Sequence, residues 1–417
     1  MTIRNLILIQ SPCVSPNLAG LYKTNPMITF NEALKTVKHA TKKLQKEHIE
    51  LSKCLNRVLA EGVVSPIAIP PFNKSAMDGF ACRQADLAEA LEILETLPAG
   101  TPPSKTVGKN QCSKIMTGAM LPEGADCVVM VEHTEMTDDN HVRFTETNTK
   151  TNICFKGEDI QENDVVLKKG TRIKAQHISV LAEIGCTEPL VYQRVKIGII
   201  ATGSELVEPN EKPNATQIRN VNSWQLMAQL EKIGITGNYY GIVADSKEAT
   251  KAVVAKCIEE NDLLIVSGGV SVGEFDYIPQ ILKELEFNIW FHTLSVKPGK
   301  HTVFGTRKGK YVFAMPGNPV SSFVQFELLG KTLVFRLMGH DYHPSIVRLP
   351  ISCDYKRKRV DRLEFIPVRM NANNQVVPVD YHGSAHINAF TQADGIMAIP
   401  RGVDEFTEGE FVHVRQI

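Results

Sequence analysis

A glycine-rich segment in the middle of the chain has the composition of an anion-binding loop. Ser267-Gly268-Gly269-Val270-Ser271-Val272-Gly273 comes directly after the apolar run 262–266. Paired glycines let backbone N–H groups approach an anion, and the start of a following helix adds a positive dipole end. The spacing is not that of a Walker loop. A tight strand-to-helix turn explains the same residues, so this segment alone leaves both interpretations open.

Two further segments stand in the same place relative to an apolar run. Lys297-Pro298-Gly299-Lys300 carries two lysines around a turn, and lysine is a compact charge suited to an oxyanion. Pro316-Gly317-Asn318 leads into Pro319 and Ser322, at a helix start that attracts anions. A solvated turn explains the first segment, and capping by Asn318 explains the second. Because ligands of open α/β sheets bind beyond the carboxyl ends of strands, three such loops on one sheet favour a shared anion site.

Three carboxylates follow successive predicted strands of the same region. Glu205 comes after the run 195–200, Asp245 after 236–243, and Asp276 follows the glycine-rich segment. Mg²⁺ commonly takes one or two carboxylates together with phosphate oxygens. We therefore predict a magnesium site at Glu205 and Asp276. The alternative for each acid is to complement a helix N-terminus, and that interpretation is strongest for Asp245, beside the capping residue Ser246.

The elements that must position these residues alternate between strand and helix patterns from about 195 to 342. This alternation predicts a parallel α/β sheet with right-handed crossovers. Its strands are expected at 195–200, 236–243, 262–266, 289–296 and 311–315, and Asn318-Pro319 opens a long helix. Short apolar runs between turn residues predict mainly β structure at 80–190 and again from about 344. Near the N-terminus, Thr29-Phe30-Asn31-Glu32 fits the capping box that starts a helix.

The composition excludes several classes of protein. The 417 residues include 46 Lys and Arg and 46 Asp and Glu, so net charge favours neither nucleic acid nor an anionic membrane. Nine cysteines without a C-x-x-C pair indicate neither a disulfide framework nor a zinc site. No apolar run reaches the roughly 18 residues that span a bilayer. We predict a cytoplasmic protein, with residues 1–26 as an irregular extension that makes a poor signal peptide.

Other polar clusters are less specific. Acids stand beside glycine at 75–79 and 156–159, and Thr117 precedes a glycine in a third short segment. Such residues are also ordinary turn residues. His382 and His386 are four apart, but Gly383 and Ser384 between them argue against a helix, so we favour surface or core histidines over metal ligands.

Taken in order, these segments resemble those of the MoeA family, which includes the E domain of gephyrin and the corresponding plant domain. The resemblance covers about residues 27–417. It rests on PPFNKSAMDGFA, SKIMTGAMLPEGADCVVMVE, FKGEDI, IGIIATGSEL, VADS, LIVSGGVSVGEFDY, KPGK and FAMPGNPVSS. It implies an enzyme that takes molybdopterin-AMP and molybdate, uses Mg²⁺, and releases AMP and molybdenum-bearing molybdopterin. It also implies a cytoplasmic homodimer that works after a MogA-type adenylyltransferase and before molybdoenzyme maturation factors, without nucleic acid or membrane partners.

The resemblance implies a multidomain fold of α/β and β parts. Its expected segments are an irregular extension at 1–26, a mixed α/β domain I at 27–66 and 162–194, a β-rich domain II at 67–161, a MogA-like three-layer α/β domain III at 195–342, and a small β-barrel, domain IV, at 343–417.

The family's functional residues map onto matching positions of this chain. The resemblance implies catalytic roles for Asp78, Thr117, Asp159, Glu205, Asp276, Lys297 and Lys300. It implies substrate contacts for Asp245, Ser267, Gly268, Gly269, Ser271, Gly273, Pro316, Gly317, Asn318, Ser322, Arg362 and Ser384. In a homodimer, one protomer would supply Asp78, Thr117 and Asp159 and the other the central residues. Two positions depart from the family pattern: His301 replaces the usual proline after KPGK, and Asp361 replaces the glycine before Arg362.

Three alternatives share part of this pattern. A MogA-type adenylyltransferase and a nucleotide-hydrolase family have the central α/β unit, but both lack the SAMDG, TGA and GED segments and the β-rich tail. A gephyrin-like scaffold that binds a receptor peptide would share the whole pattern. No linker or fused adenylyltransferase domain is evident here, and Asp276 and Lys297 are retained, so the sequence favours catalysis.

Overall fold

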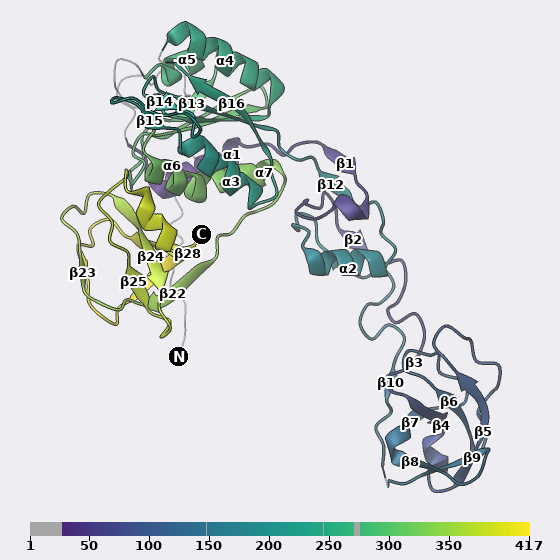
Figure 1. Cartoon of the computed structure of the whole chain (residues 1–417). Helices are drawn as coiled ribbons and strands as arrows, with labels where there is room; N and C mark the ends of the chain where they lie inside the picture. Colours follow the sequence, from purple (N-terminus) through teal and green to yellow (C-terminus); the bar gives the residue numbers. More distant parts are fainter. Residues whose placement is uncertain (1–26, 147, 245, 271–275) are drawn as a thin grey trace, which may run out of the picture. The chain divides into compact units, whose positions relative to one another are not determined.

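The computed structural model describes residues 27–146, 148–244, 246–270 and 276–417 (Figure 1). The predicted extension 1–26 and the predicted site residues Asp245, Ser271 and Gly273 lie outside the described residues. The chain divides into two compact units. Unit 1 combines the N-terminal segment through Leu44 with Arg194–Ile417, and unit 2 comprises Gln45–Gln193.

Helix α1 (Phe30–Ala40) opens unit 1 and begins at the predicted capping box. The Thr29 hydroxyl accepts from Glu32 N, and the Glu32 carboxylate accepts from Thr29 N at 2.8 Å, which confirms the prediction. The apolar face of α1, with Ala33 and Val37 buried, contacts α7 (Lys331–Leu337). The expected domain I groups α1 with 162–194, whereas the helix lies in unit 1. Periodicity identifies an apolar face but not the helix that covers it.

A six-stranded sheet forms the centre of unit 1, in the order β16-β13-β17-β21-β20-β18. Strands β16, β13, β17 and β21 are parallel to one another, whereas β20 is antiparallel to both β21 and β18. All side chains of β13 and β17 are buried, which explains their continuous apolar sequence. The bounds are β13 Ile197–Thr202, β16 Gly237–Val243, β17 Leu263–Ser267, β18 Asn288–Phe291, β20 Val303–Arg307 and β21 Lys310–Met315.

Helices cover both faces of this sheet, which makes three layers (Figure 1). Helices α4 (Lys247–Glu260) and α5 (Ile278–Glu284) pack on one face, around a core that includes Ile200, Val254 and Ile281. Helices α3 (Asn222–Glu231) and α6 (Pro319–Gln325) pack together on the other face, and α6 continues through the π-helical turn Phe326–Gly330 into α7.

The strand predicted at 289–296 is confirmed over 289–291 but does not continue to 296. Strand β18 ends at Phe291, and a separate strand, β19 (Val296–Lys297), pairs in parallel with β24 (Leu363–Met370) of the C-terminal sheet. Strand β20 was not predicted. The polar residues His292, Thr293 and Ser295 lie between the two strands, where the chain leaves one sheet and joins another.

The C-terminal part of unit 1 is a second sheet, in the order β19-β24-β26-β28-β22, with β25 on the side of β24. A bridge between Ile351 and Val376 links the residue after β22 to β25. Ile366, Val376 and Val414 belong to its core. The remaining bounds are β22 Ile346–Pro350, β25 Val376–Pro378, β26 Gly395–Ile399, β28 Phe411–Gln416, the pair β23 Tyr355–Lys356 and β27 Glu405–Phe406, and the 3₁₀ helix Ile387–Gln392.

Unit 2 is mainly β, as predicted, but it also contains an α-helix that was not predicted, α2 (Ala175–Glu183). Its largest sheet has the order β7-β4-β6-β5-β9-β8. The bounds are β4 Gly79–Cys82, β5 Ala90–Leu97, β6 Gln111–Ile115, β7 Cys127–Met130, β8 Thr134–Met136 and β9 His141–Phe144. Three strand pairs complete the unit: β1 Lys46–His48 with β12 Leu190–Tyr192, β2 Val63–Val64 with β11 Val165–Leu167, and β3 Lys74–Ser75 with β10 Ile153–Cys154.

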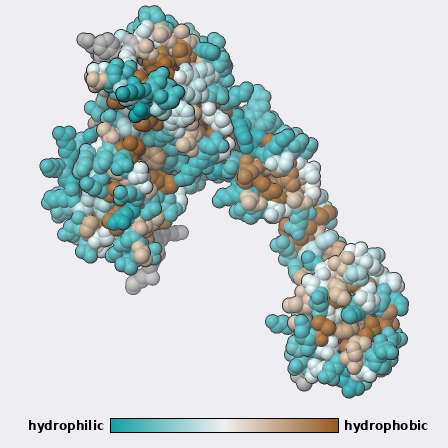
Figure 2. Space-filling model, in the orientation of Figure 1, coloured by the Kyte–Doolittle hydropathy of each residue, from teal (hydrophilic) through white to brown (hydrophobic). Residues whose placement is uncertain are grey.

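The surface carries apolar side chains in separate patches. On the face shown in Figure 2, these patches lie among polar residues. Of the helices that the structure describes, none has the length and apolar character needed to cross a membrane.

Candidate functional site

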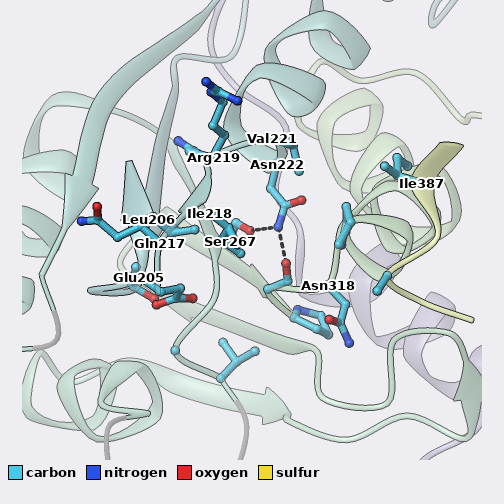
Figure 3. A pocket seen from close by; sticks show the side chains of 18 of the residues that line it. Glu205, Leu206, Gln217, Ile218, Arg219, Val221, Asn222, Ser267, Asn318 and Ile387 are labelled. Atoms are coloured by element: carbon cyan, nitrogen blue, oxygen red, sulfur yellow. Dashed lines mark hydrogen bonds between the residues drawn. The ribbon is translucent and has the colours of Figure 1, made fainter. Parts of the chain in front are cut away.

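A cavity of about 940 Å³ lies in unit 1 beyond the carboxyl ends of β13, β17 and β21 (Figure 3). This is the edge of a parallel sheet where strand order and helix starts create a binding crevice. The predicted site residues that line it are Glu205, Ser267, Gly269, Asp276, Pro316, Gly317 and Asn318. Other lining residues include Thr202, Arg219, Asn222, His301, Ala385 and Ile387.

The glycine-rich loop after β17 needs its glycines because it lies directly on the end of β13. Gly268 and Gly269 have φ of 96° and 67°, which L side chains rarely adopt. A Cβ on Gly268 would lie 2.5 Å from Thr202 O, and one on Gly269 would lie 2.8 Å from Thr202 Oγ1. Gly268 N also donates to Met315 O at 3.0 Å. Both glycines therefore permit a close approach between the ends of three neighbouring strands.

A glycine also leaves room for the side chain of Glu205, just after the end of β13. Gly203 has φ of 148°, and a Cβ there would lie 2.5 Å from a carboxylate oxygen of Glu205. Ile218 N donates to Glu205 O at 2.8 Å, which holds the start of β14 (Leu206–Val207) beside β15 (Ile218–Arg219). Gly203 therefore leaves open the space in which the exposed Glu205 carboxylate lies.

The donor set of the cavity fits a magnesium ion that is completed by substrate. Glu205 and Asp276 both line the cavity. In the described parts of the chain, no three His, Cys, Asp or Glu side chains cluster as a metal site. Mg²⁺ keeps several water or phosphate ligands and needs only one or two carboxylates, so these two residues suit it.

His301 lines the cavity, and the charged groups around it shift its pKa. Burial lowers its pKa, and the neighbouring Lys300 and His292 lower the pKa further, whereas the Asp276 carboxylate raises it. Arg362 also lowers the pKa of His301. Lys300, Asp276 and Arg362 therefore lie within electrostatic range of one imidazole that lines the cavity, although Lys300 and Arg362 do not line it themselves.

Lys297 is held by the C-terminal sheet rather than by the central one. Its ammonium pairs with Glu364 at 2.6 Å, and Arg357 pairs with the other carboxylate oxygen at 3.1 Å. Arg362 Nη1 donates to Val296 O at 3.3 Å beside this pair. Lys297 does not line the cavity, and its side chain is 42% exposed.

The start of α6 is also fixed from the C-terminal part. Asn318 is the N-cap residue, as predicted, but its side chain makes no capping hydrogen bond. Instead, Asn318 Nδ2 donates to Ser384 Oγ at 2.9 Å, and Val320 N donates to Ser384 O at 3.0 Å. Side-chain capping by Asn318 was therefore the wrong explanation, because Ser384 satisfies the first free N–H group of the helix. Ser322 is fully buried in α6 and does not line the cavity.

Unit 2 brings two of its three predicted site residues together. Asp78 Oδ1 accepts from Thr117 N at 2.6 Å and from Thr117 Oγ1 at 2.8 Å. The backbone N–H and then the hydroxyl of Thr117 lower the pKa of Asp78. Gly79 is required next to it, since a Cβ would lie 1.9 Å from Val129 O. Asp159 is exposed in a different turn, where its N–H donates to Ile69 O at 3.1 Å.

Sequence reasoning missed some cavity residues, of which Asn222 and Arg219 are the clearest. Asn222 donates from Nδ2 to Ser267 Oγ and to Gly317 O, at 2.7 Å each (Figure 3). Arg219 Nε donates to Pro209 O at 3.1 Å. The signal that was available is the pair of asparagines at 220 and 222, just before an apolar helical pattern.

Comparisons with known proteins assign the chain to a family. The model of the MoeA N-terminal region (domains I and II) matches residues 28–185, that of a probable molybdopterin-binding domain matches 198–335, and that of the MoeA C-terminal region (domain IV) matches 349–417. A molybdopterin molybdenumtransferase of Staphylococcus epidermidis is 36% identical over 91% of this chain and 94% of its own length. One of Staphylococcus aureus is 34% identical over 94% and 96%.

Solved structures agree with the sequence relatives. A molybdopterin biosynthesis MoeA protein of Pyrococcus horikoshii superposes with a TM-score of 0.80 and 29% identity, over 94% of this chain and all of its own. Since the curated relatives exceed 30% identity over nearly their whole length, the chain belongs to the MoeA family, whose curated relatives are molybdopterin molybdenumtransferases.

Proposed function

We propose that this protein transfers molybdenum from molybdate to adenylated molybdopterin, with Mg²⁺, and releases AMP. One observation carries the proposal beyond family membership. Two carboxylates, Glu205 and Asp276, line the same cavity as the glycine-rich loop at 267–269 and the loop at 316–318. This combination suits a substrate with phosphates that must be bound together with a divalent ion.

Each part of the cavity then has a chemical task. The two loops bind the phosphates of the adenylated pterin through backbone N–H groups and the Ser267 hydroxyl. Glu205 and Asp276 hold Mg²⁺, which when bound polarises the phosphoanhydride. From outside the cavity lining, Lys297 and Lys300 offset negative charge as molybdate approaches and AMP leaves. His301 also lines the cavity, and burial, Lys300 and His292 lower its pKa.

Release of AMP tests this function directly. The protein is incubated with adenylated molybdopterin, Mg²⁺ and molybdate, and AMP is measured over time. We expect Asp276→Asn to abolish molybdate-dependent AMP release without loss of the fold. The matched control is Glu259→Ala, which removes an exposed acid near the end of α4, outside the cavity lining. Normal AMP release by Asp276→Asn, or no release by the unmodified protein, contradicts the proposal.

We also propose that the protein acts as a homodimer in which Asp78 and Thr117 of one copy serve the cavity of the other. An exposed apolar patch in unit 2 supports an interface, since Val64 and Val165 are register partners on β2 and β11 and are 48% and 57% exposed. Mixing two inactive variants tests this arrangement. Asp78→Ala and Asp276→Asn, inactive alone, should recover activity together because one cavity of a mixed dimer is intact. No recovery in a proven mixed dimer contradicts a shared site.

The adenylyltransferase alternative is less favoured, because it accounts only for the central α/β part. The matches at 28–185 and 349–417 lie outside that part. The two reactions also need different co-substrates, because adenylation consumes a nucleoside triphosphate and the proposed transfer consumes molybdate. We also propose that the reaction takes place in the cytoplasm, after a MogA-type adenylyltransferase and before molybdoenzyme maturation factors.

A further inference from the structure

We propose that Asn222 is a positioning residue that holds the two anion loops of the cavity in one fixed arrangement, an inference that rests on the proposed function. Its Nδ2 atom donates to Ser267 Oγ and to Gly317 O, both at 2.7 Å (Figure 3). Ser267 is both the last residue of β17 and the first residue of the glycine-rich segment, and Gly317 lies in the loop after β21. One amide group therefore joins two loops from a third element, helix α3.

The sheet alone leaves these loops weakly connected. Strands β17 and β21 are register partners as far as Ser267 and Met315, and Gly268 N still donates to Met315 O at 3.0 Å. Beyond that bond the loops diverge from the ladder, yet a Cβ on Gly317 would lie only 3.8 Å from Gly268 Cα. The bond from Asn222 to Gly317 O acts beyond the end of this ladder, and its bond to Ser267 Oγ acts at the last paired residue of β17.

Chemistry fixes the orientation of the Asn222 amide. Gly317 O can only accept a hydrogen bond, so the group that faces it must be the NH₂. An aspartate of the same shape would place an oxygen against this carbonyl, and an alanine would contact neither loop. Asn222 is 6% exposed, so water has little access to replace the two bonds. The position therefore requires a side-chain amide.

The same region retains buried polar atoms that stability alone does not explain. Among the described residues, Asn222 Oδ1 and Thr202 Oγ1 have no hydrogen-bond partner, and both side chains line the cavity. An unpaired buried polar atom lowers stability, and each such atom requires an explanation. Thr202 lies directly under Gly268 and Gly269, so both unpaired atoms belong to residues that support the same loop.

A double-mutant cycle tests the connection. The variants are Asn222→Ala, Ser267→Ala and their combination, with Asn222→Asp as a second variant that keeps the size of the side chain. Affinity for AMP is measured by calorimetry, and KM and kcat of AMP release are measured separately. If Asn222 acts by joining the loops, breaking either end breaks the connection. We therefore expect Asn222→Ala to weaken AMP binding about tenfold alone but less than about threefold in the Ser267→Ala protein.

The KM should rise by a similar factor while kcat changes less, because the loops bind phosphate. The matched control is Gln225→Ala, on the same helix, whose amide makes only a long bond of 3.4 Å to Pro319 O. We expect this control to bind AMP normally. Equal weakening by Asn222→Ala in both backgrounds, or by the control, overturns the inference. So does a variant that unfolds at lower temperature while its AMP affinity and KM stay unchanged.

The outcome for Asn222 is separable from the proposed function. If the unmodified protein binds AMP but releases none with molybdate, the proposed function fails and the cycle still decides the role of Asn222. If it does not bind AMP at all, both proposals are refuted.

Discussion

The buried carboxylate of Glu364 gives a prediction that can be worked out from the contacts of Lys297. Glu364 lies in β24 with its side chain 5% exposed, and it pairs with Lys297 at 2.6 Å and with Arg357 at 3.1 Å. The variant Glu364→Gln removes the charge but keeps the shape and one acceptor oxygen. We expect the protein to fold with reduced stability and Lys297 to lose its fixed position.

The stability effect follows from what each cation keeps. Arg357 also donates to Val403 O at 2.7 Å and to Pro400 O at 2.5 Å, so its guanidinium stays hydrogen-bonded. The Lys297 side chain is 42% exposed, and such a pair contributes at most about 1 kcal/mol. A hydrogen bond to a charged group contributes about 1.5–3 kcal/mol. We therefore expect Glu364→Gln to lower the free energy of unfolding by about 2 kcal/mol, measured by urea titration.

The effect on catalysis separates positioning from stability. If Glu364 orients the Lys297 ammonium, its loss should slow AMP release about tenfold, equivalent to about 1.4 kcal/mol of activation free energy. The same substitution in a Lys297→Ala protein should change the rate less than about twofold, because the group that it positions is absent. Equal slowing in both backgrounds would refute the reasoning, since Glu364 would then act without Lys297.

Three further predictions concern other contacts of the site. Thr117→Val should raise the pKa of Asp78 only part of the way to its ordinary 3.8, because the larger contribution, the Thr117 N–H, remains; NMR titration measures it. A carboxyl group whose pKa is lowered by folding stabilises the protein above its unfolded-state pKa, and this stabilisation is lost as pH falls through the folded-state pKa. The variant should therefore be less stable than the parent only around and above pH 3.8. An unchanged pKa of Asp78 contradicts the assigned bond. Gly203→Ala should weaken Mg²⁺ binding about tenfold by calorimetry, because its Cβ would lie 2.5 Å from a Glu205 oxygen; unaltered binding would show that the Glu205 carboxylate does not hold the ion. Ser384→Ala should cost about 1 kcal/mol or less of unfolding free energy, because Val320 N keeps its bond to the carbonyl oxygen of residue 384, and a larger loss would point to a second role for the hydroxyl.

The central sheet was predictable because its signal is local. Strands β13, β17 and β21 are buried apolar runs, and the rule that ligands bind beyond their carboxyl ends is enough to place Glu205, Ser267 and Gly317 at one edge. The capping box at the start of α1 is local in the same sense. Patterns of this kind need no knowledge of what packs against them.

The contacts that fix the site are not local, and sequence reasoning did not find them. The pairing of β19 with β24 joins residues 296–297 to 363–364, and the sequence of neither segment indicates that it pairs with the other. Asn222 was not among the predicted site residues, although its amide bonds to both Ser267 and Gly317. A single sequence shows which residues can bind an anion but not which distant side chains hold them in place.

The C-terminal sheet therefore does more than add a folded segment to an α/β domain. Through Glu364 it holds the lysine of one loop, and through Ser384 it holds the first turn of α6 beside another. Both loops are also bonded to the central sheet or its helices, so each is held from two sides. Because binding geometry tolerates displacements of only a fraction of an ångström, loops held from two sides keep a cavity prearranged for its substrate. The parallel sheet alone would place the same residues at the same edge without fixing their distances, which is why the chemistry of this cavity depends on both parts of unit 1.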